Sequence, residues 1–380
     1  MRTGSQRCLI DSPGAARHFN PFRFHPISIV RVHIDGIIFS LQKHGGITTY
    51  FRELFKRFAP EHGVCLTLEQ PLQQAFSSAD APAVERVERP GRTLERMRLA
   101  RPPDDRRFDV YHSTYYRRPA SSAQPSVVTV HDFVYQRFVH GPKKWRHQWH
   151  MLRAIRQAQR IICVSEATRQ DLLEFVPIRS DQRVSVIHHG VADLFRPLQD
   201  TGTPAEIRRP FILFVGQRAG YKNFGLALSA LTLLPDLELH CVGGGALTDE
   251  ELSIVPPSTR DRVRYLGFVD DERLNLLYNQ ARCLLYPSLY EGFGIPVLEA
   301  MHAGCPVVCV DCKAVLEIGG TALSVSEDPH DPGALAKAIF ATLDVDIRAK
   351  LRALGLQRCQ QFSWDRCFDE TLAVYRSLQP

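Results

Sequence analysis

Short apolar runs alternate with helix-like segments along the N-terminal half of the chain. Residues 27–34 (ISIVRVHI) predict a first strand, and further strands are predicted at VCLTL, DVYHS, SVVTV, RIICV and VSVI. After the first strand, residues 47–58 (ITTYFRELFKRF) predict an amphipathic helix. Its large apolar side chains recur at helical spacing and fall near one face: Tyr50, Phe51, Leu54, Phe55 and Phe58.

The C-terminal half repeats this alternation more regularly. The runs FILFV, LELHCVG, VRYLG, CLLYP and PVVCV predict strands, and NFGLALSALTLL, DERLNLLYNQA and PVLEAMHA predict helices between them. Strands that alternate with helices are typical of a parallel sheet covered by helices on both faces. The fold class is therefore α/β.

The polar, proline-bearing stretch at 196–210 predicts a linker between two domains. We expect an N-terminal domain over residues 27–200 and a C-terminal domain over 201–362, each a doubly wound Rossmann-like unit, with the two facing a cleft. Residues 1–26 mix Gly, Pro, Ser and Arg without a long apolar segment. They predict a poorly ordered extension rather than a signal peptide.

Composition narrows the class of protein. The chain has 380 residues, of which 44% are hydrophobic and 23% are charged, as in water-soluble globular proteins. No apolar run approaches the roughly 20 residues that span a bilayer. The net charge of +6 is too small to indicate a nucleic-acid partner. Ten cysteines without a paired framework favour a reducing cytoplasm.

Positive charge gathers in two segments, 92–107 and 143–160. The second predicts a basic helix that carries Trp145 and Trp149. A solvated helix face is the simpler interpretation. The alternative is peripheral contact with an anionic membrane surface, or with a lipid-linked acceptor, at the cytoplasmic face of the inner membrane.

Two patterns are similar to metal sites, and neither predicts one. His302, Cys305, Cys309 and Cys312 have ligand-like spacing, but the cysteines flank and enter an apolar strand, so buried small hydrophobes are favoured over zinc. A D-x-D spacing at Asp344 lies in a helical context far from the other candidate residues. We therefore expect no metal and no cofactor.

The most informative segment is YPSLYEGFGIPVLEAMHAGCPVV, which places Glu291 in a glycine loop and Glu299 one turn inside the helix that follows. Pro296 suits a first helical turn, so the helix is expected to begin near Ile295. A strand, a glycine loop and a helix N-terminus form a site for negative charge. Two carboxylates beside such a site suggest a ligand with a phosphate end and several hydroxyls.

Other candidate residues follow predicted strands. Arg218 and Lys222 lie between the strand FILFV and the next helix, where both cations are placed to hold a diphosphate. Gly46 precedes the helix at 47–58 and predicts a second anion site, although a simple turn explains it equally well. His131 and Asp132 end the strand SVVTV. His131 is a candidate for contact with a sugar, and Asp132 for orienting it or capping the chain.

These pieces together resemble the family 4 retaining glycosyltransferases of the GT-B fold, over nearly the whole chain from residue 27. The most specific match is the family's E-x7-E motif, here Glu291 and Glu299. Supporting matches are KHGGITTYF, HSTYY, TVHDFVY, ICVSEATRQDL, VIHHGVADLF, VGQRAGYKNF and FSWDRCFDETLAVY. The last one resembles the family's final helix, so residues 363–380 are expected to cross back onto the N-terminal domain.

The resemblance also implies roles for single residues. Lys222 and Arg218 would stabilise the donor diphosphate, although Gln217 stands where members often carry Arg. Glu299 would bind ribose hydroxyls, and Gly46 would approach the diphosphate from the other domain. As catalytic residues, Glu291 would face the transferred sugar and His131 would touch it. The remaining donor-binding positions belong to the glycine loop: Gly292, Phe293, Gly294 and Ile295.

The function implied is retaining transfer of a hexose from a nucleotide-diphosphate sugar to a glycan or a lipid-linked acceptor, without a metal. GDP-mannose is the donor expected from the likeness to enzymes of bacterial surface-polysaccharide and lipopolysaccharide assembly. Two alternatives stay open. One is an epimerase or phosphorylase of the same fold, and the other is a non-catalytic nucleotide-sugar-binding protein.

Overall fold

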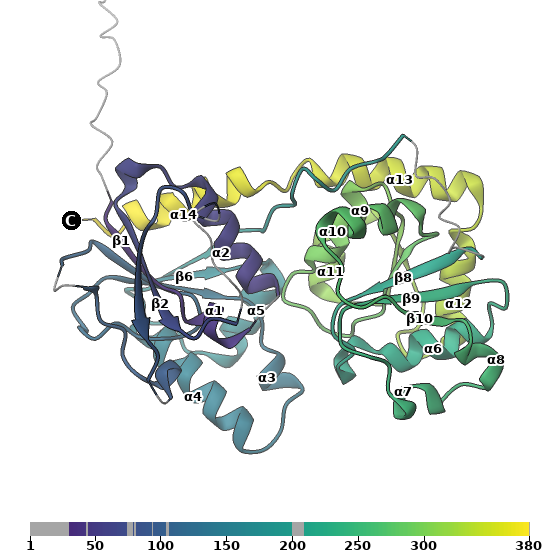
Figure 1. The fold of residues 1–380 in the computed structure, drawn as a ribbon, viewed down its shortest axis with the longest axis horizontal. Helices are drawn as coiled ribbons and strands as arrows, with labels where there is room; N and C mark the ends of the chain where they lie inside the picture. Colours follow the sequence, from purple (N-terminus) through teal and green to yellow (C-terminus); the bar gives the residue numbers. More distant parts are fainter. Residues whose placement is uncertain are drawn as a thin grey trace, which may run out of the picture.

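The computed structural model describes residues 30–42, 45–73, 79, 81–92, 94–103, 106–199 and 209–379. Within these residues, two parallel sheets build two lobes that lie side by side (Figure 1). The expected extension at 1–26, the start of the first predicted strand and most of the expected linker lie outside the described residues.

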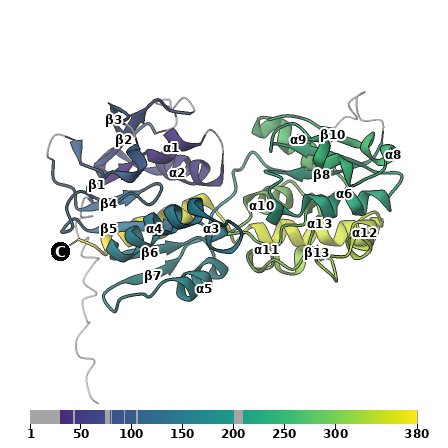
Figure 2. The same ribbon diagram turned by 90° about the horizontal axis from the view of Figure 1, so that it is seen from below.

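The N-terminal sheet has seven parallel strands in the order β3-β2-β1-β4-β5-β6-β7, which Figure 2 shows from the top to the bottom of the left lobe. In chain order the strands are β1 (Val32–Asp35), β2 (Val64–Gln70), β3 (Glu85–Pro90), β4 (Val110–Ser113), β5 (Ser126–Val130), β6 (Arg160–Cys163) and β7 (Arg183–Val186). In register, Val32 pairs with Val64 on one side and with Val110 on the other. The strand order therefore reverses at β1 and β4, as in a doubly wound fold.

The C-terminal sheet repeats this plan with six parallel strands in the order β10-β9-β8-β11-β12-β13. The strands are β8 (Phe211–Val215), β9 (Glu238–Val242), β10 (Val263–Tyr265), β11 (Leu284–Tyr286), β12 (Val307–Cys309) and β13 (Leu323–Val325). Its order reverses between β8 and β11, where Leu213 pairs with Leu284. The fold is the predicted pair of doubly wound α/β units.

Helices connect the strands in both lobes. Those of the N-terminal lobe are α1 (Ile37–Leu41), α2 (Gly46–Arg57), α3 (Val134–Arg137), α4 (Pro142–Gln157) and α5 (Glu166–Phe175). Those that follow β8 are α6 (Phe224–Thr232), α7 (Asp249–Ser253), α8 (Pro257–Arg260), α9 (Asp271–Gln280), α10 (Ile295–His302), α11 (Lys313–Gly319), α12 (Pro332–Ala341), α13 (Val345–Cys359) and α14 (Trp364–Arg376).

Alternating side chains explain why both faces of the sheets are covered. In β8, Phe211 and Leu213 enter one apolar cluster, whereas Ile212 and Phe214 enter another on the opposite face. The predicted face of α2 is also confirmed, because Tyr50, Phe51, Leu54 and Phe55 are all fully buried. The long apolar runs of the sequence are therefore strands buried on two sides.

The final helix, α14, belongs to the core of the N-terminal lobe. Trp364 and Phe368 join the apolar cluster around α2, and the Tyr375 hydroxyl lies 2.7 Å from Nδ1 of His112 in β4. Arg57 of α2 also donates to Asp365 at 2.6 Å. The chain thus crosses from α13 on one lobe to α14 on the other, as Figure 1 shows in yellow.

Two strands were not expected from the sequence. β3 has the sequence ERVERP and an alternately exposed, charged pattern, which suits a sheet edge that must not pair further. β13 has only three residues and lies at the other sheet's edge. Neither contains an apolar run long enough to stand out from a loop.

Candidate active site

The predicted site residues gather at the switch point of the C-terminal sheet. Lys222 ends the short 3-10 helix (Gly220–Lys222) that follows β8, and Glu291 lies in the loop between β11 and α10. Because β8 and β11 are neighbouring parallel strands, their carboxyl ends open onto the same crevice. Ligands of doubly wound sheets bind at this place.

Lys222 and Glu291 form the centre of the site. The Lys222 Nζ lies 2.5 Å from Oε1 of Glu291 and donates to the Tyr286 hydroxyl at 3.4 Å. Their side chains are only 13% and 11% exposed, so the pair is held where water screens it weakly. An ammonium has three N–H donors, and these two contacts account for two of them.

The glycine loop after Glu291 inserts against the N-terminal lobe. The Gly292 carbonyl accepts hydrogen bonds from the hydroxyls of Ser165 at 2.6 Å and Thr168 at 2.9 Å. A Cβ atom on Gly292 would lie 1.7 Å from the carbonyl oxygen of His131, so only glycine fits there. Phe293 is buried, with its ring 4.7 Å from that of His189.

Two further polar contacts fasten the lobes together. The Tyr290 hydroxyl donates to Asp171 at 2.6 Å and accepts from the backbone N–H of Phe133 at 2.8 Å. Glu317 of α11 accepts from the first amides of α5, on Glu166 and Ala167, at 2.7 and 2.9 Å. A carboxylate is favourable at a helix N-terminus, so this contact holds α5 to the C-terminal lobe.

Two helix N-termini approach each other across the gap. Gly294, with φ of +106°, precedes α10 and its backbone geometry suits glycine. Gly46 begins α2 in the other lobe, and a Cβ there would lie 3.5 Å from Cδ1 of Ile295. The free N–H groups of both helices therefore lie close to the same space, which favours an anion.

Glu299 lies inside α10, as expected, and accepts a hydrogen bond from the Tyr278 hydroxyl at 3.0 Å. Burial raises the pKa of its carboxyl to about 7. The group therefore changes charge near neutral pH. Asp271 lies nearby at the exposed start of α9, and partial desolvation raises the pKa of its carboxyl, with Lys56 of α2 opposing the shift.

His131 is a buried, neutral imidazole. Burial lowers its pKa to about 3, and its Nε2 atom has no hydrogen-bond partner within the described structure. The ring lies edge-on to Tyr50 and is stacked with His189 at 6.0 Å. A buried nitrogen without a hydrogen bond destabilises the folded protein. A hydroxyl of a bound ligand could supply the missing hydrogen bond to Nε2 of His131.

Asp132 caps the chain locally, because its Oδ1 accepts from the backbone N–H of Val134 at 3.0 Å. Burial raises the pKa of its carboxyl, and the charges of Glu291 and Lys222 from the other lobe also act on it. Asp132 therefore lies within electrostatic reach of the central pair.

Arg218 is placed differently from Lys222. Its guanidinium, with a side chain only 3% exposed, donates to Glu251 at 2.7 Å. It also donates to the carbonyls of Gly243, Gly245 and Ala246 at 3.1, 2.9 and 2.8 Å. Arg218 thus fixes the glycine turn after β9 in this conformation. Contact with a diphosphate remains a prediction for it.

Sequence reasoning gave no role to two phenols of the site, Tyr278 and Tyr286. Both are buried in apolar surroundings and each hydroxyl meets a charged site residue. The available signals were a tyrosine at the end of the aliphatic strand β11 and another on the apolar face of α9, because a buried hydroxyl needs a partner.

No metal site accompanies these residues in the described part of the chain, where no group of three or more His, Cys, Asp or Glu side chains could hold an ion. Cys305, Cys309 and Cys312 are buried free thiols, and burial raises the pKa of each. The search of described helices also found none long and apolar enough to cross a membrane.

Two doubly wound lobes with this crevice between them define the GT-B class of protein. A family model described as Glycosyltransferase Family 4 matches residues 44–193, and one described as Glycosyl transferases group 1 matches residues 209–344. The chain therefore contains both of these glycosyltransferase domains, the first in the N-terminal lobe and the second in the C-terminal lobe.

Curated relatives include mannosyltransferases. The chain is 39% identical over 176 residues to the O-antigen chain mannosyltransferase B of Escherichia coli, a match that covers 44% of this chain and 46% of the relative. It is 26% identical over 260 residues to the serotype-specific mannosyltransferase WbdA of Escherichia coli, covering 63% of this chain and 32% of the relative. These matches thus span less than half of either relative's own length.

Solved structures share the fold. Sucrose-phosphate synthase from Thermosynechococcus elongatus matches with a TM-score of 0.74 at 20% identity, covering 92% of this chain and 99% of that one. WaaG, a glycosyltransferase involved in lipopolysaccharide biosynthesis, matches with a TM-score of 0.69 at 15% identity, covering 90% and 99%. At these identities the likeness concerns the fold.

Proposed function

We propose that the protein is a retaining hexosyltransferase that uses a nucleotide-diphosphate sugar. The observation that carries this proposal is the Lys222–Glu291 pair, held 2.5 Å apart at the switch point. Opposite it lie the Gly46 end of α2 and the buried His131. A cation, two helix N-termini and several hydroxyl-binding groups around one crevice match a ligand with a diphosphate and a sugar.

Charge development explains what each group would do. Cleaving the sugar–phosphate bond builds positive charge at the anomeric carbon and negative charge on the departing diphosphate. Lys222 and the N–H groups at the starts of α2 and α10 are fixed in advance where that negative charge would form, which lowers the barrier. Glu291, paired with Lys222, would lie beside the sugar, and His131 would bind one of its hydroxyls.

Retention can be reached by attack on the face that the leaving group departs from. Glu291 is engaged by Lys222, an arrangement that suits orienting the sugar and stabilising positive charge better than acting as a free nucleophile. No cofactor or metal is assigned a step in this scheme. The diphosphate is stabilised by the protein's own cation and dipoles.

The donor and acceptor are proposed from the relatives and the resemblance. The names of the relatives concern mannose and O-antigen chains. We therefore propose GDP-mannose as donor, and as acceptor a growing glycan or its lipid-linked form, in the synthesis of a surface polysaccharide. This places the reaction in the cytoplasm or at the cytoplasmic face of the membrane.

Donor binding should depend on pH through Glu299. Ribose hydroxyls need the carboxylate as acceptor, and the carboxyl pKa near 7 means that only about a tenth of it is ionised at pH 6. The apparent Kd for GDP-mannose should therefore be about tenfold weaker at pH 6 than at pH 8. A thermal-shift titration over nucleotide diphosphates and their sugars measures this.

Glu299→Gln is the matched variant for that titration, because it keeps the size of the side chain and removes its ionisation. Its Kd should be weaker than that of the wild type at pH 8 and flat between pH 6 and 8. If no nucleotide sugar stabilises the wild-type protein at either pH, the proposed donor class is wrong.

Product analysis separates the remaining alternatives. An epimerase would convert the donor sugar without any acceptor, and a phosphorylase would require phosphate. A non-catalytic protein would bind a nucleotide sugar without turnover. A cation at the diphosphate serves binding as well as catalysis, so turnover that requires an acceptor is the result that identifies a transferase.

Peripheral membrane contact is a second part of the proposal. On α4, Trp145 is 70% exposed and Trp149 is 49% exposed, beside Lys144. Cosedimentation with vesicles of phosphatidylglycerol should weaken about fivefold or more when Trp145→Ala and Lys144→Gln are combined, since each surface cation contributes about 1 kcal/mol. Phe340→Ala, which removes a 66% exposed aromatic on α12, should leave cosedimentation unchanged. If the α4 variant cosediments as the wild type does, the proposed membrane contact through α4 is wrong.

A further inference from the structure

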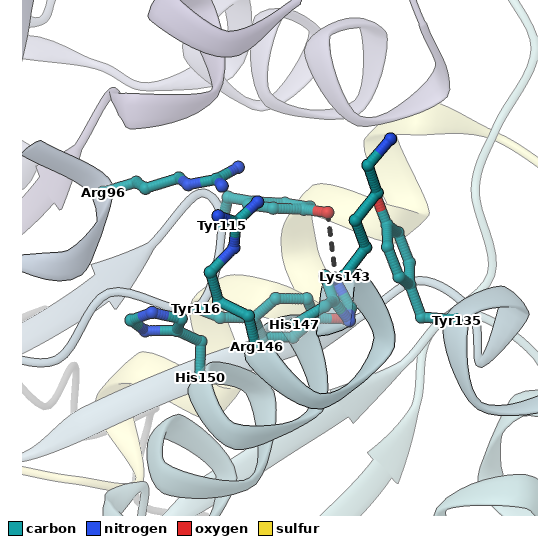
Figure 3. Close-up of a pocket in the computed structure, with 8 residues that line it drawn as sticks. All are labelled: Arg96, Tyr115, Tyr116, Tyr135, Lys143, Arg146, His147 and His150. Carbon is teal, nitrogen blue, oxygen red and sulfur yellow. Dashed lines mark hydrogen bonds between the residues drawn. The ribbon is translucent and has the colours of Figure 1, made fainter. Parts of the chain in front are cut away.

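A second pocket lies in the N-terminal lobe, away from the Lys222–Glu291 pair. It is a partly open cavity of about 70 Å³. Its lining side chains come from the 3-10 helix η3 (Glu95–Met97), the segment after β4, α3 and α4 (Figure 3). We call it the α4 pocket. It is lined by Arg96, Tyr115, Tyr116, Tyr135, Lys143, Arg146, His147 and His150.

The position of the α4 pocket ties it to the reaction crevice. Tyr115 follows the carboxyl end of β4, and Tyr135 lies in α3, just after the end of β5. Pockets at this edge of a doubly wound sheet are where ligands bind. The far end of α3 leads to Phe138, whose ring lies 5.5 Å from Tyr221, the neighbour of Lys222. The two sites are therefore separate but adjacent.

Three cations line the pocket, and the carboxylate that acts electrostatically on its tyrosines Tyr115 and Tyr116 is Asp132, which does not line it. Arg96, Lys143 and Arg146 have no ion pair with a carboxylate among the described residues, and no acidic side chain lines the pocket. By contrast, the neighbouring Arg92 and Arg117 both pair with Glu95. Uncompensated cations around a concave surface favour an anionic ligand.

The α4 pocket contains side-chain groups that can form hydrogen bonds to the oxygen atoms of a ligand. The Tyr115 hydroxyl lies 3.1 Å from Nε2 of His147, whose ring is stacked on Tyr135 at 3.8 Å. Nδ1 of His147 and Nε2 of His150 are buried without a partner in the described structure. Burial, together with nearby charges that include Arg96, lowers the pKa of both rings, that of His147 to about 4.

We propose that the α4 pocket binds a phosphate or diphosphate group carried by the acceptor. This inference rests on the proposed transfer, because it assigns the pocket to the second substrate. Two guanidinium groups and an ammonium can balance a dianion, and guanidinium groups bind phosphate oxygens in pairs. The acceptor's charged group would anchor there, leaving its sugar free to reach the crevice past α3.

The group has two sources with the same chemistry. One is a lipid-linked diphosphate, whose chain would continue along the exposed Trp149 on the same helix. The other is a phosphorylated saccharide in solution. Three probes distinguish them: inorganic pyrophosphate, farnesyl diphosphate and mannose 1-phosphate.

The test is calorimetric binding of these probes to the wild-type full chain and to four variants of it, the fourth being Trp149→Ala. The wild-type protein should bind pyrophosphate at two sites. The double variant Arg96→Gln with Arg146→Gln should weaken binding at the α4 pocket at least tenfold, whereas Lys222→Gln should weaken binding at the donor site. The matched control, Lys144→Gln with Arg156→Gln, removes two charges from α4 outside the pocket and should behave as the wild type. Thermal unfolding of each variant checks that it is folded.

Each outcome decides between the proposals. If the Arg96/Arg146 variant binds pyrophosphate as the wild type does, while Lys222→Gln loses binding, the α4 pocket proposal is overturned and the donor site stands. If only the Arg96/Arg146 variant loses pyrophosphate binding, the α4 pocket proposal is supported and the proposed donor site at Lys222 is wrong. Farnesyl diphosphate that binds more tightly than mannose 1-phosphate, and is weakened by Trp149→Ala, assigns the anion to a lipid-linked acceptor. The reverse order assigns it to a phosphorylated saccharide.

Discussion

Lys222→Gln should lower hexose transfer about 100- to 1000-fold, the usual cost of removing one preorganised donor to a developing negative charge. The substitution removes the cation nearest the departing diphosphate in the proposed scheme. Single-turnover kinetics with GDP-mannose would measure the chemical step, and acceptor-independent hydrolysis of the donor should fall in parallel. Binding of the donor should weaken less than turnover, because the charge matters most in the transition state.

Besides slowing transfer, Lys222→Gln should lower the stability of the protein, and the two effects have to be measured separately. Removing Lys222 leaves the Glu291 carboxylate, only 11% exposed, without its partner, and an unpaired buried charge is destabilising. Lys222→Gln combined with Glu291→Gln should therefore recover thermal stability without recovering transfer.

The charge-matched control is Lys337→Gln. Lys337 also pairs with a glutamate in the C-terminal lobe, but there both side chains are more than 70% exposed. Its loss should change neither rate nor stability appreciably. Transfer by Lys222→Gln within a few-fold of wild type would contradict the assigned role.

Gly292→Ala should also abolish most transfer, by about 100-fold or more, through geometry rather than charge. The added Cβ would lie 1.7 Å from the His131 carbonyl oxygen, a backbone atom that cannot turn aside as the end of a side chain could. The lobes must then separate, which breaks the bonds from Ser165 and Thr168 to the Gly292 carbonyl. Steady-state transfer and donor titration by thermal shift measure the two consequences.

We expect donor affinity to fall less than the rate, because most donor-binding groups proposed here belong to the C-terminal lobe. Gly225→Ala is the control: it adds a Cβ in α6 at 3.4 Å from Ile254, an ordinary contact, and should leave transfer unchanged. If Gly292→Ala transfers sugar within twofold of the wild type, the lobes do not need the close approach seen between Gly292 and His131.

Much of the fold could be predicted because its strands are buried on both faces. FILFV has no polar residue on either side, and in SVVTV even Ser126 and Thr129 are buried, as strands of a covered parallel sheet require. β3 escaped detection because its edge position permits a charged sequence. The order of the strands, which decides that β8 lies beside β11, depends on crossovers that no local pattern records.

The sequence was enough to propose the residues of the candidate site, but not the contacts between them. Glu291, Lys222 and the glycine loop stand out because strand, glycine and helix start coincide. That Lys222 meets Glu291, 69 positions away, follows from the switch point and not from either segment alone. Arg218 shows the reverse case, since its partner Glu251 lies on α7 and turns the guanidinium toward a glycine turn.

The sequence predicted only one of the two surfaces of the basic helix α4. Its sequence suggested a solvated face or a membrane surface, and exposed Trp145 agrees with either. The opposite side of α4 closes a pocket against Tyr115 and Arg96, which come from segments about 30 to 50 positions earlier. A helical periodicity records which residues share a face, but not what lies across from it.

The location of α14 has a consequence for how the protein is made. Trp364, Phe368 and Tyr375 complete the apolar interior of the first lobe, yet they are translated after every strand of the second. The first lobe therefore emerges from the ribosome unfinished, and its apolar surface stays open to solvent or chaperones until α14 has been made. Nascent chains halted before α14 should be recognised by proteases as incomplete, even when the second lobe has already folded.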